Sequence, residues 1–311
     1  MKWIRILSIF LVPCFLGLAS GVQAEQRVNE RVKADGGGEV YVDNIAGQVK
    51  VEGWSEKAVE VTGTIGDDLE LQLERKGRRT LVSVKYPERH GSHHQVADIV
   101  VRVPVASQVS VETVSANIEA RSLSGRVEIE SVSGSIELDV QSKEIEAESV
   151  SGDIDLRAAK AEIDVAAISG DLQIRIQEGT VDAETVSGDL QIQMEEGIVD
   201  AETVSGDIDV IAVKLIGGDA QSISGDIGFD VALGPACRLD LEAHSGDVDL
   251  VLPSGASAEI DLETYSGSIR NRLGGEQVGG DSKRELNLLL GSGDARVDIS
   301  TFSGGIQLRA K

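Results

Sequence analysis

The stretch Thr180-Val-Asp-Ala-Glu-Thr-Val-Ser-Gly-Asp-Leu190 returns almost unchanged as Ile198-Val-Asp-Ala-Glu-Thr-Val-Ser-Gly-Asp-Ile208. Its central motif, Val/Ile-Ser-Gly-Asp/Ser-Ile/Leu, recurs in both directions along the chain. The interval is constant from Ser115 to Ser205 and lengthens slightly from there to Ser266. Self-similarity at a fixed period is typical of repeat architectures. The serines of the motif are Ser115 (a degenerate copy), Ser133, Ser151, Ser169, Ser187, Ser205, Ser224, Ser245, Ser266 and Ser303.

Apolar residues alternate with polar ones in two short blocks of each unit. An alternation of period two indicates β-strands, and polar or small segments such as Ala158-Ala159-Lys160 and Glu195-Glu196-Gly197 indicate turns between them. We therefore predict an all-β fold, a β-solenoid of the parallel β-helix or β-roll type, with about 18 residues and two strands per winding. Its roughly ten windings would build a rod about 50 Å long. The apolar residues expected to stack inside the unit around Ser151 are Val150, Ile154, Leu156, Ile163, Val165 and Ile168, and those of the unit around Ser187 include Val186 and Val204.

Other repeat folds fit this pattern less well. A β-propeller blade takes about forty residues and usually carries an aromatic signature, and a leucine-rich repeat needs a helix or an Asn-Leu ladder. An antiparallel meander of the same short strands stays open as an alternative. A unit that repeats every two strands favours helical winding over that meander.

The chain divides into three segments. Residues 1–24 have the features of a secretory signal peptide, because Lys2 and Arg5 precede an apolar run and Val22-Gln23-Ala24 offers a small-residue cleavage site. Residues 25–110 contain irregular alternating blocks that we interpret as an N-terminal β segment or cap, which would cover the first winding of the solenoid. Residues 111–311 form the repeat solenoid. The mature chain is then expected to be soluble, and to lie in the periplasm or at the cell surface.

Charge and cysteine content narrow the range of functions. The chain has 29 Lys and Arg against 53 Asp and Glu, a net charge of −24, which argues against a nucleic acid or an anionic membrane surface as partner. Signal cleavage would leave Cys237 alone, so an intramolecular disulfide is excluded. We expect this cysteine to be a small buried hydrophobic residue rather than a nucleophile, because no neighbouring base accompanies it.

The aspartates that follow the motif glycines raise the question of a metal. They would form one column along a corner of the solenoid, and Asp164, Asp182, Asp200 and Asp219 a second. Calcium between windings would relieve their mutual repulsion, but the paired glycine loops of calcium-binding β-rolls are missing. Solvated aspartates that cap turns are the favoured interpretation, and weak calcium binding stays open. The candidate residues are Asp153, Asp171, Asp189, Asp207, Asp226 and Asp247.

Other candidate sites carry weaker signals. His90, His93 and His94 share one polar loop, but no definite fourth ligand accompanies them, so we favour chance clustering. No nucleophile motif, phosphate loop or convincing acid–base pair is found. We therefore assign no catalytic residue, no organic cofactor and no confident metal ligand.

Three stretches together resemble the bacterial putative-adhesin domain family, a domain of unknown function. They are Gly47-Gln-Val-Lys-Val-Glu-Gly-Trp54, the serial Val-Ser-Gly-Asp-Ile units, and Leu288-Leu-Leu-Gly-Ser-Gly-Asp-Ala-Arg-Val-Asp-Ile-Ser-Thr-Phe-Ser-Gly-Gly-Ile306. The resemblance covers roughly residues 30–311. It implies a β-solenoid of the bacterial envelope or surface without established catalytic residues.

We accordingly expect an exported, non-enzymatic binding or scaffold module. Its partner would be an envelope or surface protein or a glycan, contacted by the flat faces of the rod. Two alternatives are a carbohydrate-active solenoid enzyme and a structural rod that assembles end to end through open windings. Exposed positions that could contact a partner include Gln173, Arg175, Gln191 and Gln193.

Overall fold

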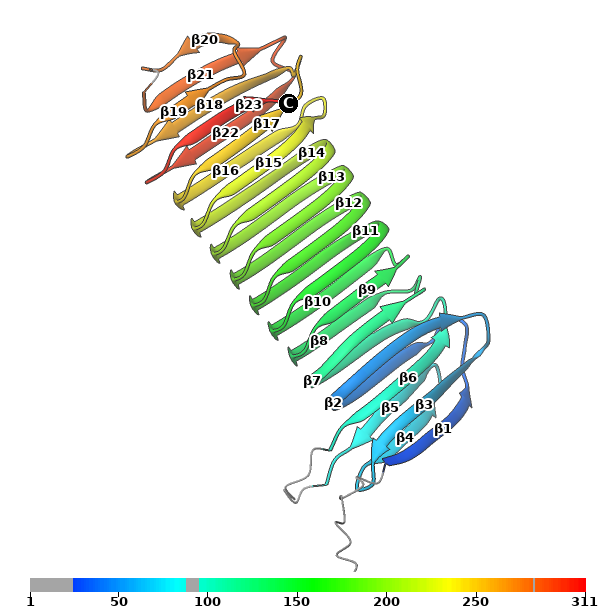
Figure 1. Cartoon of the computed structure of the whole chain (residues 1–311). Helices are drawn as coiled ribbons and strands as arrows, with labels where there is room; N and C mark the ends of the chain where they lie inside the picture. Colours follow the sequence, from blue (N-terminus) through cyan, green and yellow to red (C-terminus); the bar gives the residue numbers. More distant parts are fainter. Residues whose placement is uncertain (1–24, 88–94, 282) are drawn as a thin grey trace, which may run out of the picture.

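The computed structural model describes residues 25–87, 95–281 and 283–311. The expected signal peptide and the three-histidine loop lie outside these residues. The described chain contains 23 β-strands, which stack into one elongated rod, and no helix (Figure 1). In chain order the strands are β1 (Glu25–Lys33), β2 (Glu39–Trp54), β3 (Ala58–Gly66), β4 (Glu70–Lys76), β5 (Arg79–Lys85), β6 (Ala97–Pro104), β7 (Gln108–Arg121), β8 (Val127–Ser133), β9 (Ile136–Val140), β10 (Glu144–Ser151), β11 (Ile154–Ser169), β12 (Leu172–Ser187), β13 (Leu190–Ser205), β14 (Ile208–Ser224), β15 (Ile227–Leu233), β16 (Arg238–Ser245), β17 (Val248–Leu252), β18 (Ala258–Thr264), β19 (Ile269–Asn271), β20 (Glu276–Gly279), β21 (Glu285–Leu290), β22 (Ala295–Thr301) and β23 (Ile306–Ala310).

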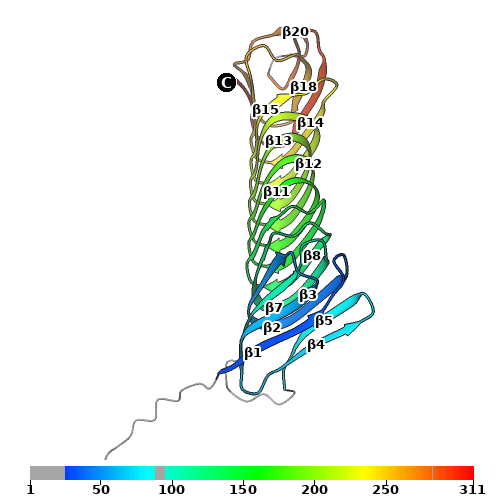
Figure 2. The same ribbon diagram turned by 90° about the vertical axis from the view of Figure 1, so that its right-hand side faces the viewer.

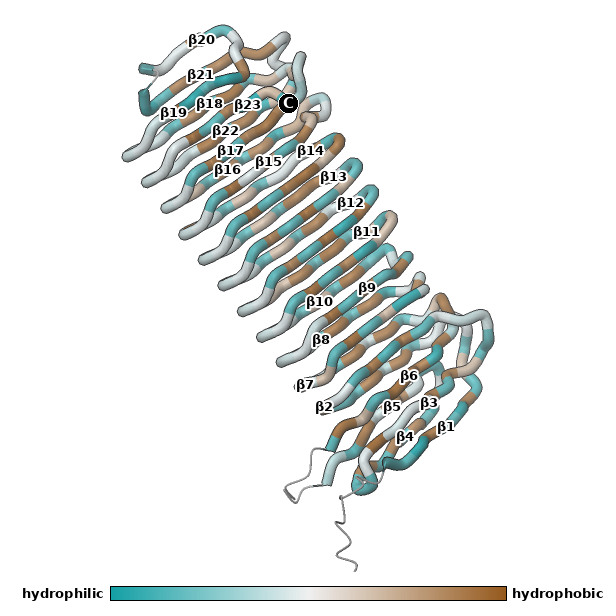
Figure 3. The backbone as a smooth tube through the Cα atoms, viewed as in Figure 1, coloured by the Kyte–Doolittle hydropathy of each residue, from teal (hydrophilic) through white to brown (hydrophobic). Residues whose placement is uncertain are grey.

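The regular middle of the rod confirms the β-solenoid. Strands β11 to β14 pair in parallel, and Leu172 lies opposite Leu190, which lies opposite Ile208. Each residue therefore stacks on its equivalent one winding away, and the inward side chains form one continuous core. Figure 3 shows the resulting alternation of hydrophobic and hydrophilic residues along each strand.

Each winding has two faces joined by a bend and a corner. In β12 the first face is formed by residues 172–176 and the second by residues 179–187, and the Ser-Gly-Asp motif turns the corner to β13. The sequence predicts a turn at this bend, but the structure places the bend inside the long strands. The parallel register continues through it, since Glu178 lies opposite Glu196 and Gly179 lies opposite Gly197. We call the first face of these windings the mixed face and the second the acidic face, after the charges described below.

Glycine is required at the corner by close stacking. A Cβ atom built on Gly188 would lie 2.1 Å from the carbonyl oxygen of Gly170, and one on Gly206 would lie 1.9 Å from that of Gly188. A side chain on Gly188 or Gly206 would push the adjacent windings apart. The recurring glycine of the sequence repeat thus reflects the approach of one corner to the next.

One part of the inward pattern was predicted wrongly. Val150, Ile168, Val186 and Val204 were expected inside the solenoid, but their side chains are 43 to 53% exposed. The inward positions are taken by the preceding residues, such as Thr185, so strict alternation turns the next side chain outward.

The windings do not follow chain order at either end. The β5–β6 winding stacks on one side of β2, and β7 stacks on the other. At the opposite end, β22 lies between β16 and β18, and β23 lies between β17 and β19. The last winding in sequence is thereby inserted between two earlier ones.

Antiparallel strands cover both ends of the rod. Strand β3 pairs with β6 and β1, and β4 pairs with β5, while β21 pairs with β18 and β20 at the other end (Figure 2). The boundary expected between residues 110 and 111 lies inside β7. Because β2 stacks on β7 in parallel, the solenoid continues on both sides of that position.

Candidate binding surface

The predicted corner aspartates form a ladder. The Oδ1 atom of Asp153 accepts a hydrogen bond from the backbone N–H of Asp171 at 3.0 Å, and the same contact repeats in each following winding as far as Asp247, which accepts from Gly305 at 2.7 Å. Asn117 makes the equivalent contact with the N–H of Ser135. Each of these side chains therefore satisfies a backbone amide of the next winding.

This ladder has the geometry of a series of turn caps. A neutral amide oxygen serves as well as a carboxylate at the position of Asn117, so the contact does not depend on charge. Across residues 25–87, 95–281 and 283–311, no group of three or more His, Cys, Asp or Glu is arranged to hold a metal ion. Calcium binding at the aspartates stays a hypothesis.

Cys237 lies in the core and is 1% exposed. Burial raises the pKa of its thiol to about 11, with a weaker opposing effect from a backbone hydrogen bond with Gly234. A thiol that remains protonated at neutral pH is a poor nucleophile. The residue packs as a small hydrophobic side chain.

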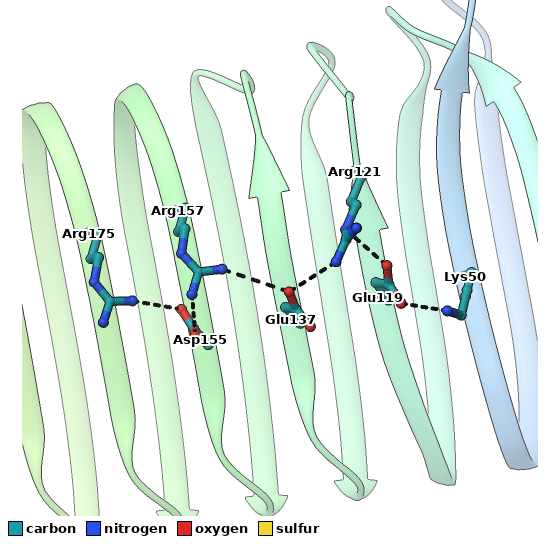
Figure 4. Close-up of polar contacts among 7 residues, drawn as sticks. All are labelled: Lys50, Glu119, Arg121, Glu137, Asp155, Arg157 and Arg175. Atoms are coloured by element: carbon teal, nitrogen blue, oxygen red, sulfur yellow. Dashed lines mark hydrogen bonds and ion pairs between the residues drawn. The ribbon is translucent and has the colours of Figure 1, made fainter.

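On the mixed face, acidic and basic side chains compensate one another. Gln173 donates a hydrogen bond to Gln191, and Arg175 forms an ion pair with Asp155 at 3.3 Å. Gln173, Gln191 and Arg175, which the sequence indicates as candidate contacts, are therefore partly engaged with their neighbours. A continuous series of ion pairs crosses several windings (Figure 4), and its members are Lys50, Glu119, Arg121, Glu137, Arg157, Asp155 and Arg175.

The acidic face of the described chain has little such compensation. Asp164, Asp182 and Asp200 stack directly on one another, and Glu184 stacks on Glu202 in the adjacent column. Within the described residues, ion pairs occur only towards the ends of these columns, where Arg126 contacts Glu144 and Glu146, and Arg296 contacts Asp261 and Asp298. Between those ends, the described acidic residues of these two columns that have no ion-pair partner are Glu148, Asp164, Asp182, Glu184, Asp200, Glu202, Asp219, Asp240 and Glu242.

The pKa values of stacked carboxyl groups on the acidic face are raised. Desolvation raises the pKa of Asp182 and Asp200, and the neighbouring aspartate in the next winding raises each further. Desolvation likewise raises the pKa of Glu202, followed by the charge of Glu184. The face thus holds negative charges that repel one another across the windings.

An exposed apolar stripe runs beside the acidic face. It occupies the position just before the motif serine in successive windings, and its side chains are 40 to 55% exposed between β2 and β14. At the C-terminal end, His244, Phe302 and Tyr265 take the same position and stack with ring centroids 4.9 and 4.8 Å apart. The aliphatic members of the stripe are Ile45, Val114, Val132, Val150, Ile168, Val186, Val204 and Ile223.

Between the stripe and the nearest acidic column lies a groove of about 800 Å³. In β12, Glu184 and Val186 point outward and form its two walls, while the buried Thr185 between them forms its floor. The groove runs from Asp43 on β2 to His244 on β16, across the strands and along the rod. We call it the corner groove.

The sequence pattern indicates the corner aspartates and residues of the mixed face as candidate contacts, but it does not indicate the corner groove. The strict alternation of inward and outward side chains along each strand is the signal that could have revealed the groove. Ala183 and Thr185 occupy inward positions, so the same count places Val186 outside, beside Glu184. The hydrophobicity of Val186 taken alone predicts a core position, which the structure contradicts.

Short repeated windings, a core of stacked aliphatic side chains and strand-capped ends define an elongated β-solenoid with a lengthwise groove. The chain belongs to the Toastrack DUF4097 family, whose model matches residues 40–236 and, in a second match, residues 199–309. This confirms the resemblance to an adhesin-type domain of unknown function.

The chain also matches several solved structures. One is described as a putative adhesin from Bacteroides fragilis, with 10% identity, a TM-score of 0.41, and coverage of 92% of this chain and 98% of that chain. Another is described as a putative lipid binding protein from Parabacteroides distasonis, with 14% identity, a TM-score of 0.45, and coverage of 91% and 96%. No curated protein matches the chain. The described residues include no helix that could cross a bilayer.

Proposed function

We propose that this protein is an exported, non-enzymatic binding module of the bacterial envelope, which holds an elongated partner along the corner groove. The observation that carries the proposal is the combination of an exposed apolar stripe with an uncompensated acidic wall over most of the described rod. Contiguous exposed apolar surface commonly marks an interaction site. The difference in charge between the two faces directs the partner to one side.

Export rests on the sequence of residues 1–24. Cleavage after Ala24 would leave a mature protein that begins at Glu25, the first residue of β1. Cell fractionation and mass spectrometry of the recovered chain test this. A product that retains Met1 in the cytoplasm would contradict export.

A non-enzymatic role is supported by the repetition of the acidic residues. Glu184 and Glu202 occupy equivalent positions in successive windings and stack directly on one another. A glycosidase instead distinguishes two carboxyl groups by their environments, one as acid and one as base or nucleophile. A glycan-degradation screen with product detection would support the carbohydrate-active alternative only if it returned turnover.

End-to-end assembly is the structural alternative. The antiparallel strands at both ends cover the terminal windings, and β1 is rich in charged residues, a feature that blocks strand addition. We therefore expect a monomer. Light scattering that showed polymers growing with protein concentration would favour the structural rod.

Site-specific photo-cross-linking in the envelope fraction tests the binding role. A photoreactive residue at position 186 lies in the corner groove, and one at position 191 lies on the mixed face. We expect a defined cross-linked product from the first position and little from the second. Equal products from both, or none from position 186, would contradict the proposal.

A further inference from the structure

The direction of the corner groove restricts what can bind there. It runs across the strands, whose backbone N–H and C=O groups are already paired with the adjacent windings. An extended peptide lying along it would find no free strand edge in the described windings and would leave its own backbone groups unpaired against an apolar wall. An α-helix satisfies its backbone hydrogen bonds internally and contacts a surface through side chains alone.

The length of the groove suits a helix. Its walls span the windings from β2 to β16, which at a spacing of about 4.8 Å gives a length of about 40 Å. A helix of about 25 residues covers that length at about 1.5 Å per residue. Recognition of an amphipathic helix in an apolar groove is a common mode of peptide binding.

The two walls specify the chemistry of the helix. The wall formed by Val150, Ile168, Val186 and Val204 favours an apolar stripe of helical side chains. The wall formed by residues such as Glu184 lacks cationic partners among the described residues, so Lys or Arg beside that stripe would compensate its charge.

The same charges weigh against other occupants. A second copy of this chain would bring one acidic face against another, and anionic lipids and nucleic acids would be repelled. The aliphatic stripe between β7 and β14, all of it within the described residues, has no aromatic ring on which a sugar could stack, and aromatic rings appear only at its C-terminal end.

We propose that the corner groove binds a basic amphipathic α-helix of a partner protein, with its apolar stripe on the valine wall and its cationic side chains over the glutamate wall. This inference rests on the proposed binding function and adds the chemistry of the partner. The contacts repeat from winding to winding, so affinity depends on several weak contacts rather than on one pocket.

A designed peptide tests the inference. The probe is a helix of about 25 leucine and lysine residues, with leucines at i, i+3, i+4 and i+7, titrated into the mature chain by fluorescence anisotropy. We expect saturable binding that weakens as salt concentration rises, because screening reduces attraction between exposed charges. A scrambled peptide of the same composition is expected to bind at least tenfold more weakly. Equal binding of the two peptides would overturn the inference, because attraction of charge alone would then explain it.

Variants of the two walls locate the site. We expect Glu184→Gln combined with Glu202→Gln to weaken binding at least tenfold and to reduce its salt dependence. Val186→Ser combined with Val204→Ser should weaken binding to a similar extent while the salt dependence persists. The control, Asp155→Asn combined with Asp209→Asn, removes the same number of carboxylates from the mixed face and should leave affinity within twofold.

Circular dichroism and melting of each variant separate loss of binding from loss of fold. If the control and the wall variants lose affinity equally, the inference is wrong. If a neutral glycan oligomer competes with the peptide, or the peptide does not bind although position 186 cross-links a partner, the helix is wrong and the binding function stands. If the peptide does not bind and position 186 yields no product, both proposals fall.

Discussion

Ser187-Gly188-Asp189 shows how single residues set the spacing of the windings. Gly188 permits the approach of the neighbouring carbonyl group, and the Asp189 carboxylate accepts the backbone N–H of Asp207 at 3.0 Å. The two adjacent residues therefore make different contributions. The glycine removes a steric obstacle, and the aspartate satisfies an amide that the corner would otherwise leave to solvent.

We expect Gly188→Ala to destabilise the protein by about 3 kcal/mol, because the new methyl group would lie 2.1 Å from the Gly170 carbonyl oxygen and would force the windings apart. Urea unfolding followed by circular dichroism measures the change. Gly36→Ala is the matched control, since nothing lies within 4 Å of its Cβ position. An equal effect of the two substitutions would show that close stacking at the corner is not limiting.

Asp189→Ala and Asp189→Asn separate capping from charge. The alanine variant loses the acceptor for the Asp207 amide and should be destabilised by about 1 kcal/mol, whereas asparagine retains an oxygen acceptor, as Asn117 does. We expect the asparagine variant to be at least as stable as the parent in metal-free buffer. Thermal melting of the parent and of the two variants, with and without millimolar calcium, tests the metal hypothesis. A rise in the melting temperature of the parent that Asp189→Asn abolishes would favour calcium over simple capping.

The strand segments of the acidic face carry an electrostatic cost. Successive windings place like charges in register, as between Asp182 and Asp200, and the core alternation keeps them on one surface. The mixed face has the same stacking but combines acidic and basic residues, so its neighbours attract. In the windings that carry these ion pairs, the mixed face is thus stabilised by its charges, and the acidic face is destabilised by its own.

This difference predicts a rise in stability on mild acidification. Folding raises the pKa of Asp164, Asp182 and Asp200, so the native chain binds protons more tightly than the unfolded chain does. Stability should therefore increase as the pH falls from neutral towards these raised pKa values, and be lower above them, where the carboxylates ionise. Melting temperatures measured across this range, and with added salt at neutral pH, check the expectation.

Asp182→Asn combined with Asp200→Asn should raise the melting temperature at neutral pH and flatten its dependence on pH. Asp67→Asn combined with Asp139→Asn removes the same charge from positions outside the acidic face. If that control flattens the pH dependence equally, net charge rather than the stacked columns is responsible.

At the scale of the whole molecule, the C-terminal end of the rod is completed by the last winding in sequence, which inserts between two earlier windings. Strand β22 pairs with both β16 and β18, and β23 pairs with both β17 and β19. The winding formed by β18 and β19 is therefore connected to the rest of the solenoid through strands that follow it in sequence. The C-terminal end can be completed only when the final residues are present.

Truncation after Gly291 should uncouple the C-terminal end from the rod. We expect residues 258–290 to lose protection from amide hydrogen exchange, while β11 to β13 keep theirs, because each winding depends mainly on its neighbours. Val297→Ser combined with Leu308→Ser places hydroxyl groups at two buried positions of the same winding and should show the same pattern at full length. Uniform loss of protection along the whole chain would indicate that the rod unfolds as one cooperative unit instead.

The regular windings were predictable, and the site was only partly so. The constant interval between motif glycines and the alternation of period two were enough to predict that Leu172, Leu190 and Ile208 stack on one another. The same pattern put the corner aspartates in a column. It did not distinguish an inward from an outward valine at position 186, because hydrophobicity alone does not reveal which side of a strand a residue occupies.

By itself, the sequence determined the fold class, the length of a winding and the corner at each Ser-Gly-Asp motif, because these depend on contacts between equivalent residues at a fixed separation. Only the tertiary structure decided which windings are neighbours at the two ends, since those pairings join segments whose separation follows no period. The corner groove also depends on the tertiary structure, because the side chains from Val114 to Ile223 form a wall only after every winding has been stacked in register.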